Sequence, residues 1–456
     1  MPQADAPKWL TAALIPLVFS WGRPDRADWL VIGFVGWLAC SLYWSADHLA
    51  GIDALWRWAV LGAAFITLRR VDVNLPMLAC MAVWACVTME LTGYARYGGH
   101  GNENFIAEFV LIAAPVCWLW GRLGKLTTFG CVAYLLWNDS NVELAFIAVA
   151  AVVVLIVTGA RSKQDAIIAG LLGAVLAGMI AYGWHEVFIS LSYRINLAMT
   201  AGAMWLDSPV IGQGMGSYAT LYQGFASDIG RSPIEGPIIY VNSAHNELAE
   251  IAAEAGLIGI ALLGLLIWQL RCGYSMYAVA LVAALAASLV SFPLHNAPTA
   301  VLIVAIAAQL CRKEQRAGYW TLPLALVSAV ALFLSVQVIR AQHEFALMIA
   351  NVGVNNNAAF VHNVNAYQIY PFDRRTRFQL FPSVMGISGQ LGHEAVDRIY
   401  AISQHAVRDH PGVLTARLKY LVETERCDRE CIDLARHLSC EYGDIYEVYT
   451  YVRAEC

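Results

Sequence analysis

The stretch SAHNELAEIAAEAGLIGIALLGLLIWQL, residues 243–270, joins the end of a polar loop directly to a long apolar segment. The apolar part, 247–270, is long enough to cross a bilayer, which takes roughly 17–25 residues of helix. His245 and Asn246 stand where the loop meets this segment. Ionisable side chains at a membrane boundary are costly to keep without a use. The stretch therefore predicts a membrane helix with a chemical site at its mouth.

The composition extends this prediction to the whole chain. Apolar residues make up 59% of the 456 residues, charged residues make up only 14%, and the mean hydropathy is +0.55. Because a soluble domain carries about 25% charged residues, we expect an all-α, polytopic membrane protein. The net charge of −5 gives no indication of a nucleic-acid partner. Residues 9–20 lack a small-residue cleavage site after them, so we expect a first membrane helix there rather than a signal peptide.

The sequence contains twelve apolar segments that are candidates for membrane spans. They lie near residues 8–21, 28–44, 51–68, 75–93, 104–120, 126–137, 142–158, 164–183, 247–270, 273–292, 297–311 and 320–340. Three of them, 8–21, 126–137 and 297–311, are shorter than a full span. We expect these three to be tilted, half-inserted or extended by their neighbours.

The basic residues of the short loops predict the orientation. If the segments alternate, one side of the membrane receives Arg23, Arg26, Arg69, Arg70, Arg122, Lys125, Arg161, Lys163, Arg271, Arg312, Lys313 and Arg316. Because Lys and Arg concentrate in cytoplasmic loops, that side is predicted to be cytoplasmic. The chain then divides into N-terminal transmembrane helices (1–183), a large periplasmic loop (184–246), C-terminal transmembrane helices (247–340) and a periplasmic helical domain (341–456).

The tail after Ala341 differs in character from the rest of the chain. Residues 344–370 are rich in Asn and Ala and predict an extended or turn-rich linker. Short amphipathic helices are predicted after Gly392, one of them beginning at Pro411, where the missing N–H of proline costs no helical bond. We expect a small TPR-like module. Two roles stay open for it, a structural cap over the external loops and a docking module for an acceptor protein.

Four of the eleven cysteines lie close together in the tail, namely Cys427, Cys431, Cys440 and Cys456. An oxidising periplasm would pair them into two disulfides, with three possible connectivities. A zinc site is the alternative, but the spacing C-x3-C-x8-C-x15-C lacks the C-x2-C pairs of most such sites. Disulfides are therefore the favoured prediction, and no metal is expected.

Three motifs follow one another in the middle of the chain. They are the Arg…Trp…Pro-x-x-G-x-G-x-G-x-aromatic segment at Arg194–Tyr218, the pattern HN-x9-GxxG formed by His245, Asn246, Gly256 and Gly259, and TGARSK at Thr158–Lys163. Their order and spacing, over roughly residues 155–312, resemble the O-antigen ligase superfamily. That superfamily contains O-antigen ligases, Wzy-type polymerases and bacterial protein O-oligosaccharyltransferases.

The resemblance implies transfer of a glycan from undecaprenyl diphosphate to an acceptor hydroxyl, without a metal ion or a cofactor. The hydroxyl must lose its proton, which histidine can accept near neutral pH. The resemblance assigns this role to His245, with Asn246 and Glu247 close enough in sequence to orient it. For an isolated histidine, a helix-capping or interface role would be the simpler interpretation.

The leaving diphosphate requires cations, and the guanidinium fork suits phosphate oxygens. Arg194, Arg231 and Arg96 are the candidates for this contact. Arg231 is equally well explained as a solvated loop charge, whereas Arg96 is the one basic residue in an external loop otherwise without Lys or Arg. Arg161 falls on the cytoplasmic side and is interpreted as an orientation anchor.

Supporting residues are predicted in the helix that follows His245. Carboxylates are expensive inside a membrane, so Glu250 and Glu254 are expected to line a cavity or to hold an arginine. Gly256 and Gly259 are expected to allow close helix packing. The GQGMG stretch at 212–216 offers a weak signal for backbone N–H groups that bind an anion.

The long tail and four predicted spans after the large loop resemble the protein O-oligosaccharyltransferase branch, which glycosylates Ser or Thr of secreted proteins such as pilin. One departure is the segment Ser291–Asn296, SFPLHN, which keeps the Phe-Pro-Leu of that branch but replaces its acid and its aromatic pair. His295 would have to substitute for the missing aromatic side chain. The alternatives are a ligase or polymerase acting on lipid A-core or a growing glycan, and a lipid-linked sugar transporter.

Overall fold

The structure is a computed structural model that describes residues 6–14, 24–92, 103–137, 192–229, 241, 243–270, 275–312, 321–408, 410–426 and 429–442. Every secondary-structure element in these residues is a helix, which confirms the all-α prediction. The part of the chain before the tail contains α1 (Ala6–Leu14), α2 (Arg26–Ser41), η2 (Leu42–Trp44), α3 (His48–Leu68), α4 (Leu75–Leu91), α5 (Glu103–Cys117), α6 (Gly121–Trp137), α9 (Tyr218–Ile229), α10 (Glu247–Trp268), α11 (Met276–Ser288), α12 (Ala297–Leu310) and α13 (Thr321–Asn351). The tail helices are α14 (Asn356–Ile369), α15 (Arg374–Val384), η4 (Met385–Gln390), α16 (His393–Ala406), α17 (Pro411–Glu423) and α18 (Arg429–Tyr442).

Ten of the twelve predicted apolar segments coincide with helices, α1 to α6 and α10 to α13. The other two, 142–158 and 164–183, lie outside the described residues. Within the described ranges, three helical stretches are long and apolar enough to cross a membrane: Arg26–Trp44, α3 and α10. The total of twelve spans stays a prediction.

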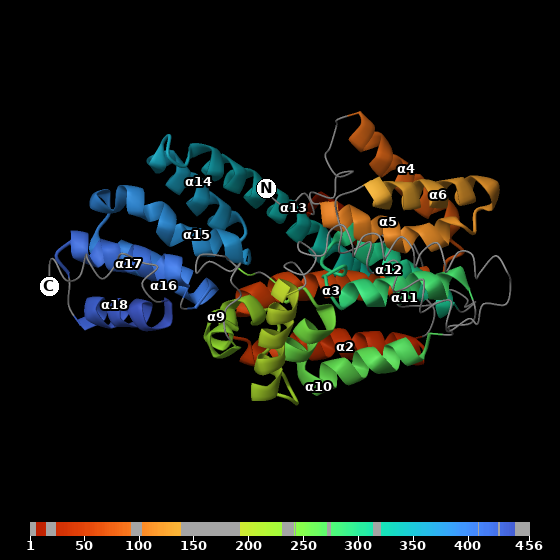
Figure 1. The fold of residues 1–456 in the computed structure, drawn as a ribbon, viewed down its shortest axis with the longest axis horizontal. Helices are drawn as coiled ribbons and strands as arrows, with labels where there is room; N and C mark the ends of the chain where they lie inside the picture. The colour runs from red at the N-terminus through yellow and green to blue at the C-terminus, as the bar shows by residue number, and fades with distance from the viewer. Residues whose placement is uncertain are drawn as a thin grey trace.

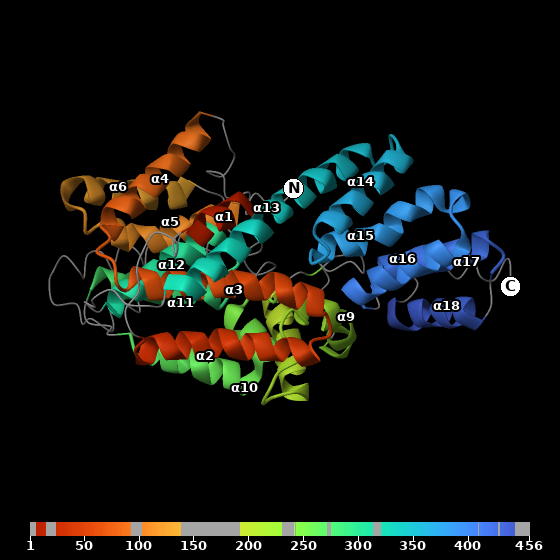
Figure 2. The same cartoon turned by 180° about the vertical axis from the view of Figure 1, so that it is seen from behind.

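The tail helices, α14 to α18, and the helices that precede them lie one after the other along the long axis of the molecule. Figures 1 and 2 show the tail helices at one end, while α2, α3 and α10 to α12 form a bundle toward the other end, with α4 to α6 packed beside it. Helix α13 is 31 residues long and runs from the bundle to α14, its closest helical partner. The helix therefore continues without interruption through Ala341, where the sequence changes character.

Helix α14 corrects the prediction of an extended linker at 344–370. The Asn355 side chain caps α14 by accepting a hydrogen bond from the Ala358 N–H at 3.0 Å, a preferred role for Asn. Ala359, Asn363 and Ala366 are buried on the helix. Tertiary packing against α13 thus outweighs the modest helix propensity of Asn, and the Asn-rich composition is not a sign of a linker here.

The remaining tail helices follow the predicted pattern. Helix α17 begins at Pro411, and the buried Val396, Val413 and Leu418 belong to a core shared by α15 to α18. Cys431 is buried in this core and is disulfide-bonded to a partner outside the described side chains. The connectivity of the tail cysteines and the TPR-like character of the module stay predictions.

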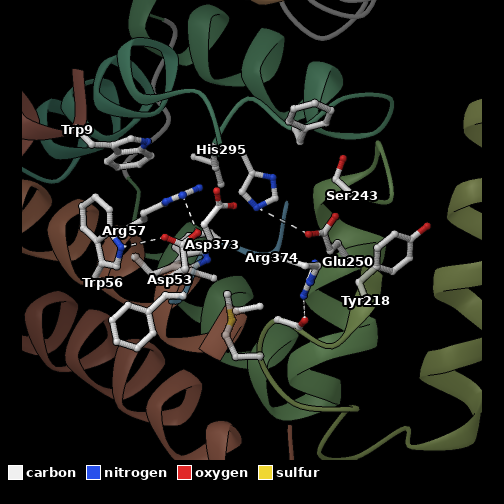
Figure 3. A pocket seen from close by; sticks show the side chains of 18 of the residues that line it. Trp9, Asp53, Trp56, Arg57, Tyr218, Ser243, Glu250, His295, Asp373 and Arg374 are labelled. Carbon is white, nitrogen blue, oxygen red and sulfur yellow. Dashed lines mark hydrogen bonds and ion pairs between the residues drawn. The ribbon is translucent and has the colours of Figure 1, made fainter. Parts of the chain in front are cut away.

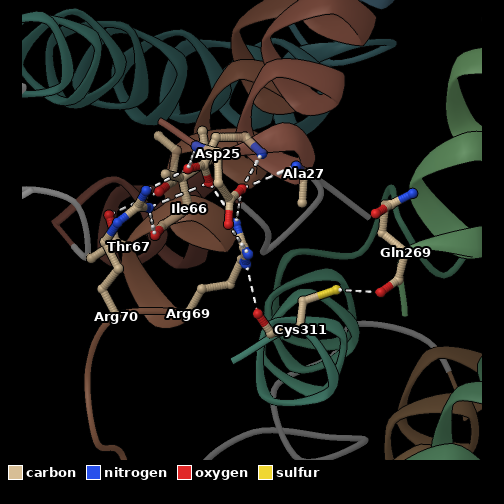
Figure 4. Close-up of polar contacts among 10 residues, drawn as sticks. Asp25, Ala27, Ile66, Thr67, Arg69, Arg70, Gln269 and Cys311 are labelled. Carbon is tan, nitrogen blue, oxygen red and sulfur yellow. Dashed lines mark hydrogen bonds and ion pairs between the residues drawn. The ribbon is translucent and has the colours of Figure 1, made fainter. Parts of the chain in front are cut away.

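Helices α2 and α3 form a hairpin whose open end is closed by charge pairs. Arg69 donates to Asp28 at 2.7 Å and to Asp25 at 2.8 Å, and Arg70 also pairs with Asp28 (Figure 4). The Arg69 Nε donates to the Cys311 carbonyl at 3.0 Å, so the same cluster reaches the end of α12. These contacts position the helices that surround α10.

Candidate active site

Helix α10 is broken at Gly256, in the middle of the HN-x9-GxxG motif. Gly256 has φ +64° and ψ −166°, and a Cβ atom there would lie 2.4 Å from the Val210 carbonyl oxygen. A left-handed φ and so close a backbone contact both require glycine. The expectation of simple helix-on-helix packing at Gly256 was therefore wrong, because the helix ends and restarts there against a loop.

The backbone groups around the break bond mostly to the loop at 208–217. The Leu257 and Ile258 N–H groups donate to the carbonyls of Pro209 and Val210, at 2.9 and 3.3 Å. In the opposite direction, the loop donates to the carbonyls of Ala253 and Glu254, at 2.8 and 2.9 Å. The carbonyl of Ala255 accepts from the Trp37 indole at 2.8 Å. A broken helix is tolerated inside a membrane only when its backbone groups find such partners.

The Gly-rich loop holds an acidic side chain of the protein itself. Gly212, Gly214 and Gly216 all have positive φ, which lets the loop lie flat against α10. The Glu254 carboxylate accepts a hydrogen bond from the Tyr218 N–H at 2.9 Å and from the backbone of Gly216. The predicted capacity of this stretch to bind an external anion is thus taken up by a carboxylate of α10.

His245 is held in an unusual backbone conformation immediately before α10. Its φ is +48°, which is uncommon for a residue other than glycine. The next residue, Asn246, caps α10 by accepting from the Ala249 N–H at 2.9 Å, and its amide donates to the Leu289 carbonyl at 2.8 Å. Asn246 therefore fixes the helix start that positions His245, and its predicted catalytic role stays a prediction.

The His245 imidazole packs in a half-buried position between ring systems and an arginine. Its ring lies edge-on to Phe292 at 4.7 Å, and its Nδ1 is buried with no hydrogen-bond partner among the described residues. Burial, followed by the charge of Arg194, lowers the pKa of His245 to about 4. The ring is consequently neutral near pH 7. Arg194 itself donates to the Val290 carbonyl at 2.7 Å.

A cavity of about 130 Å³ lies between the bundle and the tail helices (Figure 3). Its wall includes Trp9, Asp53, Trp56, Arg57, Trp58, Tyr218, Ser243, Glu250, Glu254, Phe292, His295, Asn296, Gln342, Asp373, Arg374 and Arg375. His245 is not on this wall, but it contacts Phe292, which is. The cavity thus combines aromatic, acidic and basic side chains from both halves of the molecule.

His295 is the histidine that faces the cavity directly. Figure 3 shows it between Arg57 and Glu250, and its Nε2 lies 3.8 Å from the Glu250 carboxylate, too far for a direct hydrogen bond. Burial, followed by the charge of Arg57, lowers the pKa of His295 to about 4. Glu247 lies nearby and accepts from the Leu294 N–H at 2.8 Å, so it fixes the loop that carries His295.

The tail helices reach the cavity through a buried ion cluster. Asp47, at the start of α3, is paired with Arg377 at 2.8 Å and with Arg374 at 3.4 Å. Burial raises the pKa of Asp47, but the two guanidinium charges lower it more, so the pKa lies below its usual value. The hydroxyl of Tyr370 also donates to Asp53 beside the cavity. These contacts hold the start of α15 against α3.

The structure brings together only part of the predicted site. His295, Glu250 and Glu254 share the cavity wall, whereas Arg96 and Arg231 lie outside the described residues. Sequence reasoning missed the contribution of the tail, in particular Asp373, Arg374 and Arg375. The run Asp-Arg-Arg in a chain with few charges was the available signal. Among the described residues, no group of three or more His, Cys, Asp or Glu side chains is arranged to hold a metal ion.

Comparison with known protein families gives one match, over the region that contains α10 and the Gly-rich loop. Residues 109–264 match the model of the family described as O-antigen ligase. No curated protein and no solved structure matches the chain. The match confirms the resemblance to the O-antigen ligase superfamily and supports a glycan-transferring function in general.

Proposed function

Because residues 109–264 carry an O-antigen ligase domain, we propose that the chain transfers a glycan from undecaprenyl diphosphate to an acceptor hydroxyl at the periplasmic face of the inner membrane. The observation that carries the proposal is the cavity between the bundle and the tail, with one neutral histidine on its wall and a second in contact with that wall. A bound donor would enter from the membrane side, and an acceptor would enter beside the tail helices.

The proposed reaction forms one bond and breaks one. The acceptor oxygen bonds to the anomeric carbon of the first sugar, the bond from that carbon to the diphosphate oxygen breaks, and undecaprenyl diphosphate leaves with the bonding electrons. The proton of the acceptor hydroxyl passes to an imidazole. The family motif assigns this role to His245 in the proposal, and its pKa of about 4 means that the imidazole is unprotonated at pH 7. The same lowered pKa makes it a weaker base than a free histidine, whose pKa is near 6.5. His295 is a second neutral imidazole within the cavity.

For the acceptor we propose a Ser or Thr of a secreted protein such as pilin. The support is that the tail forms part of the cavity wall through Asp373, Arg374 and Arg375, so a polypeptide bound by the tail would lie next to the reacting centre. In this proposal, Arg194 and the predicted Arg96 and Arg231 stabilise the leaving diphosphate.

The experiment uses a bacterial strain that keeps its glycan-lipid pathway but lacks its own ligases. The chain and its His245→Ala, His295→Ala and His405→Ala forms are expressed, and pilin mass and lipopolysaccharide ladders are recorded. We expect glycosylated pilin with the wild type and with His405→Ala, because His405 is exposed on α16. We expect a loss of at least about 100-fold with His245→Ala, the usual scale of general-base catalysis.

If the lipopolysaccharide ladders are restored and pilin stays unmodified, the acceptor is lipid A-core and not a protein. If His245→Ala keeps full activity and His295→Ala loses it, the general base is His295 on the cavity wall and not His245. If the wild type produces neither product although the donor is present, glycan transfer by this chain is refuted for that donor.

A further inference from the structure

Two residues that line the cavity each carry a buried polar atom that has no hydrogen-bond partner among the described residues. One is the Trp9 indole Nε1, on a side chain that is only 2% exposed, and the other is the Asn296 Oδ1, on a residue that is 1% exposed. In Figure 3 the Trp9 nitrogen points toward the interior of the cavity. Buried polar groups are nearly always paired, so an unpaired donor and an unpaired acceptor in one cavity indicate a missing ligand. A sugar hydroxyl satisfies both, because it donates and accepts.

The tail brings two neighbouring arginines to the same cavity, beside Asp373. Helix α15 begins at Arg374, and its first two residues are both arginines. Cations are unfavourable at the positive end of a helix macrodipole, so their presence there needs an explanation. Arg374 is accounted for by Asp47, at 3.4 Å. Asp373, the cap of α15, accepts from the Arg375 backbone N–H at 3.1 Å.

The Arg375 side chain is different from its neighbour. It lines the cavity, is half-buried, and forms no ion pair or hydrogen bond with any described side chain. A guanidinium at a helix N-terminus, with no acidic partner in the described part of the chain, matches the requirements for binding a phosphate group. A single water needs roughly 10–15 Å³, so a cavity of about 130 Å³ admits a much larger ligand.

We propose that the tail completes the donor site, with the Arg375 guanidinium binding the diphosphate and with Trp9 and Asn296 binding hydroxyls of the first sugar. This inference rests on the proposed function and assigns the residues that recognise its donor. It places the diphosphate between the two halves of the molecule. The tail is then part of the donor site in addition to any role in acceptor docking.

The test uses the purified full-length protein in liposomes with an undecaprenyl-diphosphate-linked oligosaccharide. Arg375→Gln is expected to raise the KM for the donor by about tenfold or more, the scale of a lost charge-assisted bond, with kcat little changed. Inhibition by inorganic pyrophosphate should weaken by a similar factor. Arg375→Lys should recover part of both effects, because it restores the charge without the planar fork. The control is Arg398→Gln on α16, an exposed arginine paired only with the exposed Glu394 among the described residues.

A second variant separates the sugar contact from the diphosphate contact. Trp9→Phe removes the indole N–H and should weaken binding of the sugar-linked donor several-fold, while binding of undecaprenyl diphosphate without sugar stays unchanged. Unchanged pyrophosphate inhibition in Arg375→Gln, with a melting temperature equal to that of the wild type, overturns the assignment of Arg375. If Arg375→Gln unfolds, the comparison of Arg375→Lys with the wild type decides, and equal pyrophosphate inhibition by both overturns it.

The two proposals fail in different ways. Pyrophosphate and undecaprenyl diphosphate binding are measured without any transfer, so a wild type that binds both but glycosylates no acceptor contradicts the proposed function alone. A wild type that transfers glycan while Arg375→Gln and Trp9→Phe behave as the wild type contradicts the donor-site assignment alone.

Discussion

The α2–α3 hairpin is closed at both ends by buried aspartates paired with two arginines, yet the two clusters connect very different parts of the chain. At one end, Asp28 pairs with Arg69 and Arg70, at sequence separations of 41 and 42 residues. At the other end, Asp47 pairs with Arg377, which is 330 residues away. The first cluster closes a hairpin, and the second attaches the tail to the membrane part.

The difference shows that the same ion-pair chemistry serves two purposes. Replacing a buried ion pair by apolar residues is often neutral or stabilising, whereas removing one partner is strongly destabilising. A buried pair is therefore better understood as fixing a geometry than as adding stability. The Asp28 cluster fixes how α2 meets α3, and the Asp47 cluster fixes where Arg375 stands relative to His295. Activity should depend on the second geometry more directly than on the first.

The largest effect is expected from Asp28→Ala. The Asp28 side chain is fully buried, and its removal breaks the ion pairs that it forms with Arg69 and Arg70. We expect a loss of about 3–5 kcal/mol in the free energy of unfolding, measured by thermal unfolding in detergent. The control is Asp72→Ala, because Asp72 is 82% exposed and pairs with Arg312 at the surface. A loss no greater than that of Asp72→Ala would contradict the structural role of the cluster.

Asp47→Ala should have a smaller effect on stability and a larger one on function. We expect a loss of about 3 kcal/mol, the lower end of the range, because Arg374 keeps some exposure at the cavity. Glycan transfer should fall at least tenfold, because the start of α15 is no longer held against α3. Limited proteolysis of the full chain should detect release of the tail. The control is Glu394→Ala, since Glu394 is exposed on α16, and unchanged activity of Asp47→Ala would show that docking of the tail is dispensable.

The contrast between the clusters also explains what the sequence could reveal. Helix positions such as α3, α10 and α17 were predictable, because apolar length and an initial proline are local signals. The break at Gly256 was not, because it depends on hydrogen bonds with a loop about forty to fifty residues earlier in the sequence. The resemblance singled out His245, but it could not show that His295 occupies the cavity wall.

Long-range charge pairing was the least predictable feature. Arg69 and Arg70 were interpreted through the membrane charge bias alone, and nothing in their sequence neighbourhood identifies Asp25 and Asp28 as partners. The pairing of Asp47 with Arg377 requires the tail to fold back onto the hairpin. A single sequence contains no period or motif that reports such a contact, so the contribution of the tail to the cavity became visible only in the structure.

Acidification should lower the folding stability of the tail before it breaks the ion pairs of Asp47 with Arg374 and Arg377. Burial lowers the pKa of His410 to about 4, whereas the unfolded value is near 6.5. Between pH 4 and pH 6.5, His410 is therefore protonated in the unfolded chain but not in the folded tail. The contribution of neutral His410 to the stability of the tail is complete above pH 6.5 and is lost as the pH falls toward 4. We expect a loss of about 2 kcal/mol between pH 7 and pH 5.

Hydrogen exchange of the tail in the full chain at the two pH values measures this loss. His410→Gln should flatten the pH dependence, whereas His405→Gln should not, because His405 is exposed. The pKa of Asp47 lies below its usual value, so the ion pair between Asp47 and Arg377 stays charged between pH 7 and pH 5. Retention of the full pH dependence in His410→Gln would assign it to other groups.

Between the two clusters the hairpin contacts α10 through a neutral hydrogen bond, and this bond should give the smallest effect. Trp37→Phe removes the donor to the Ala255 carbonyl, which the break at Gly256 has freed. We expect a loss of about 1 kcal/mol, since one buried acceptor is left unpaired, measured by thermal unfolding. Trp84→Phe is the matched control, because its indole donates at 3.0 Å to Thr127, whose hydroxyl has another partner in Leu123. Equal losses in the two variants would mean that capping of the broken helix contributes no more than an ordinary tryptophan contact, and the loop at 208–217 would then hold the break by itself.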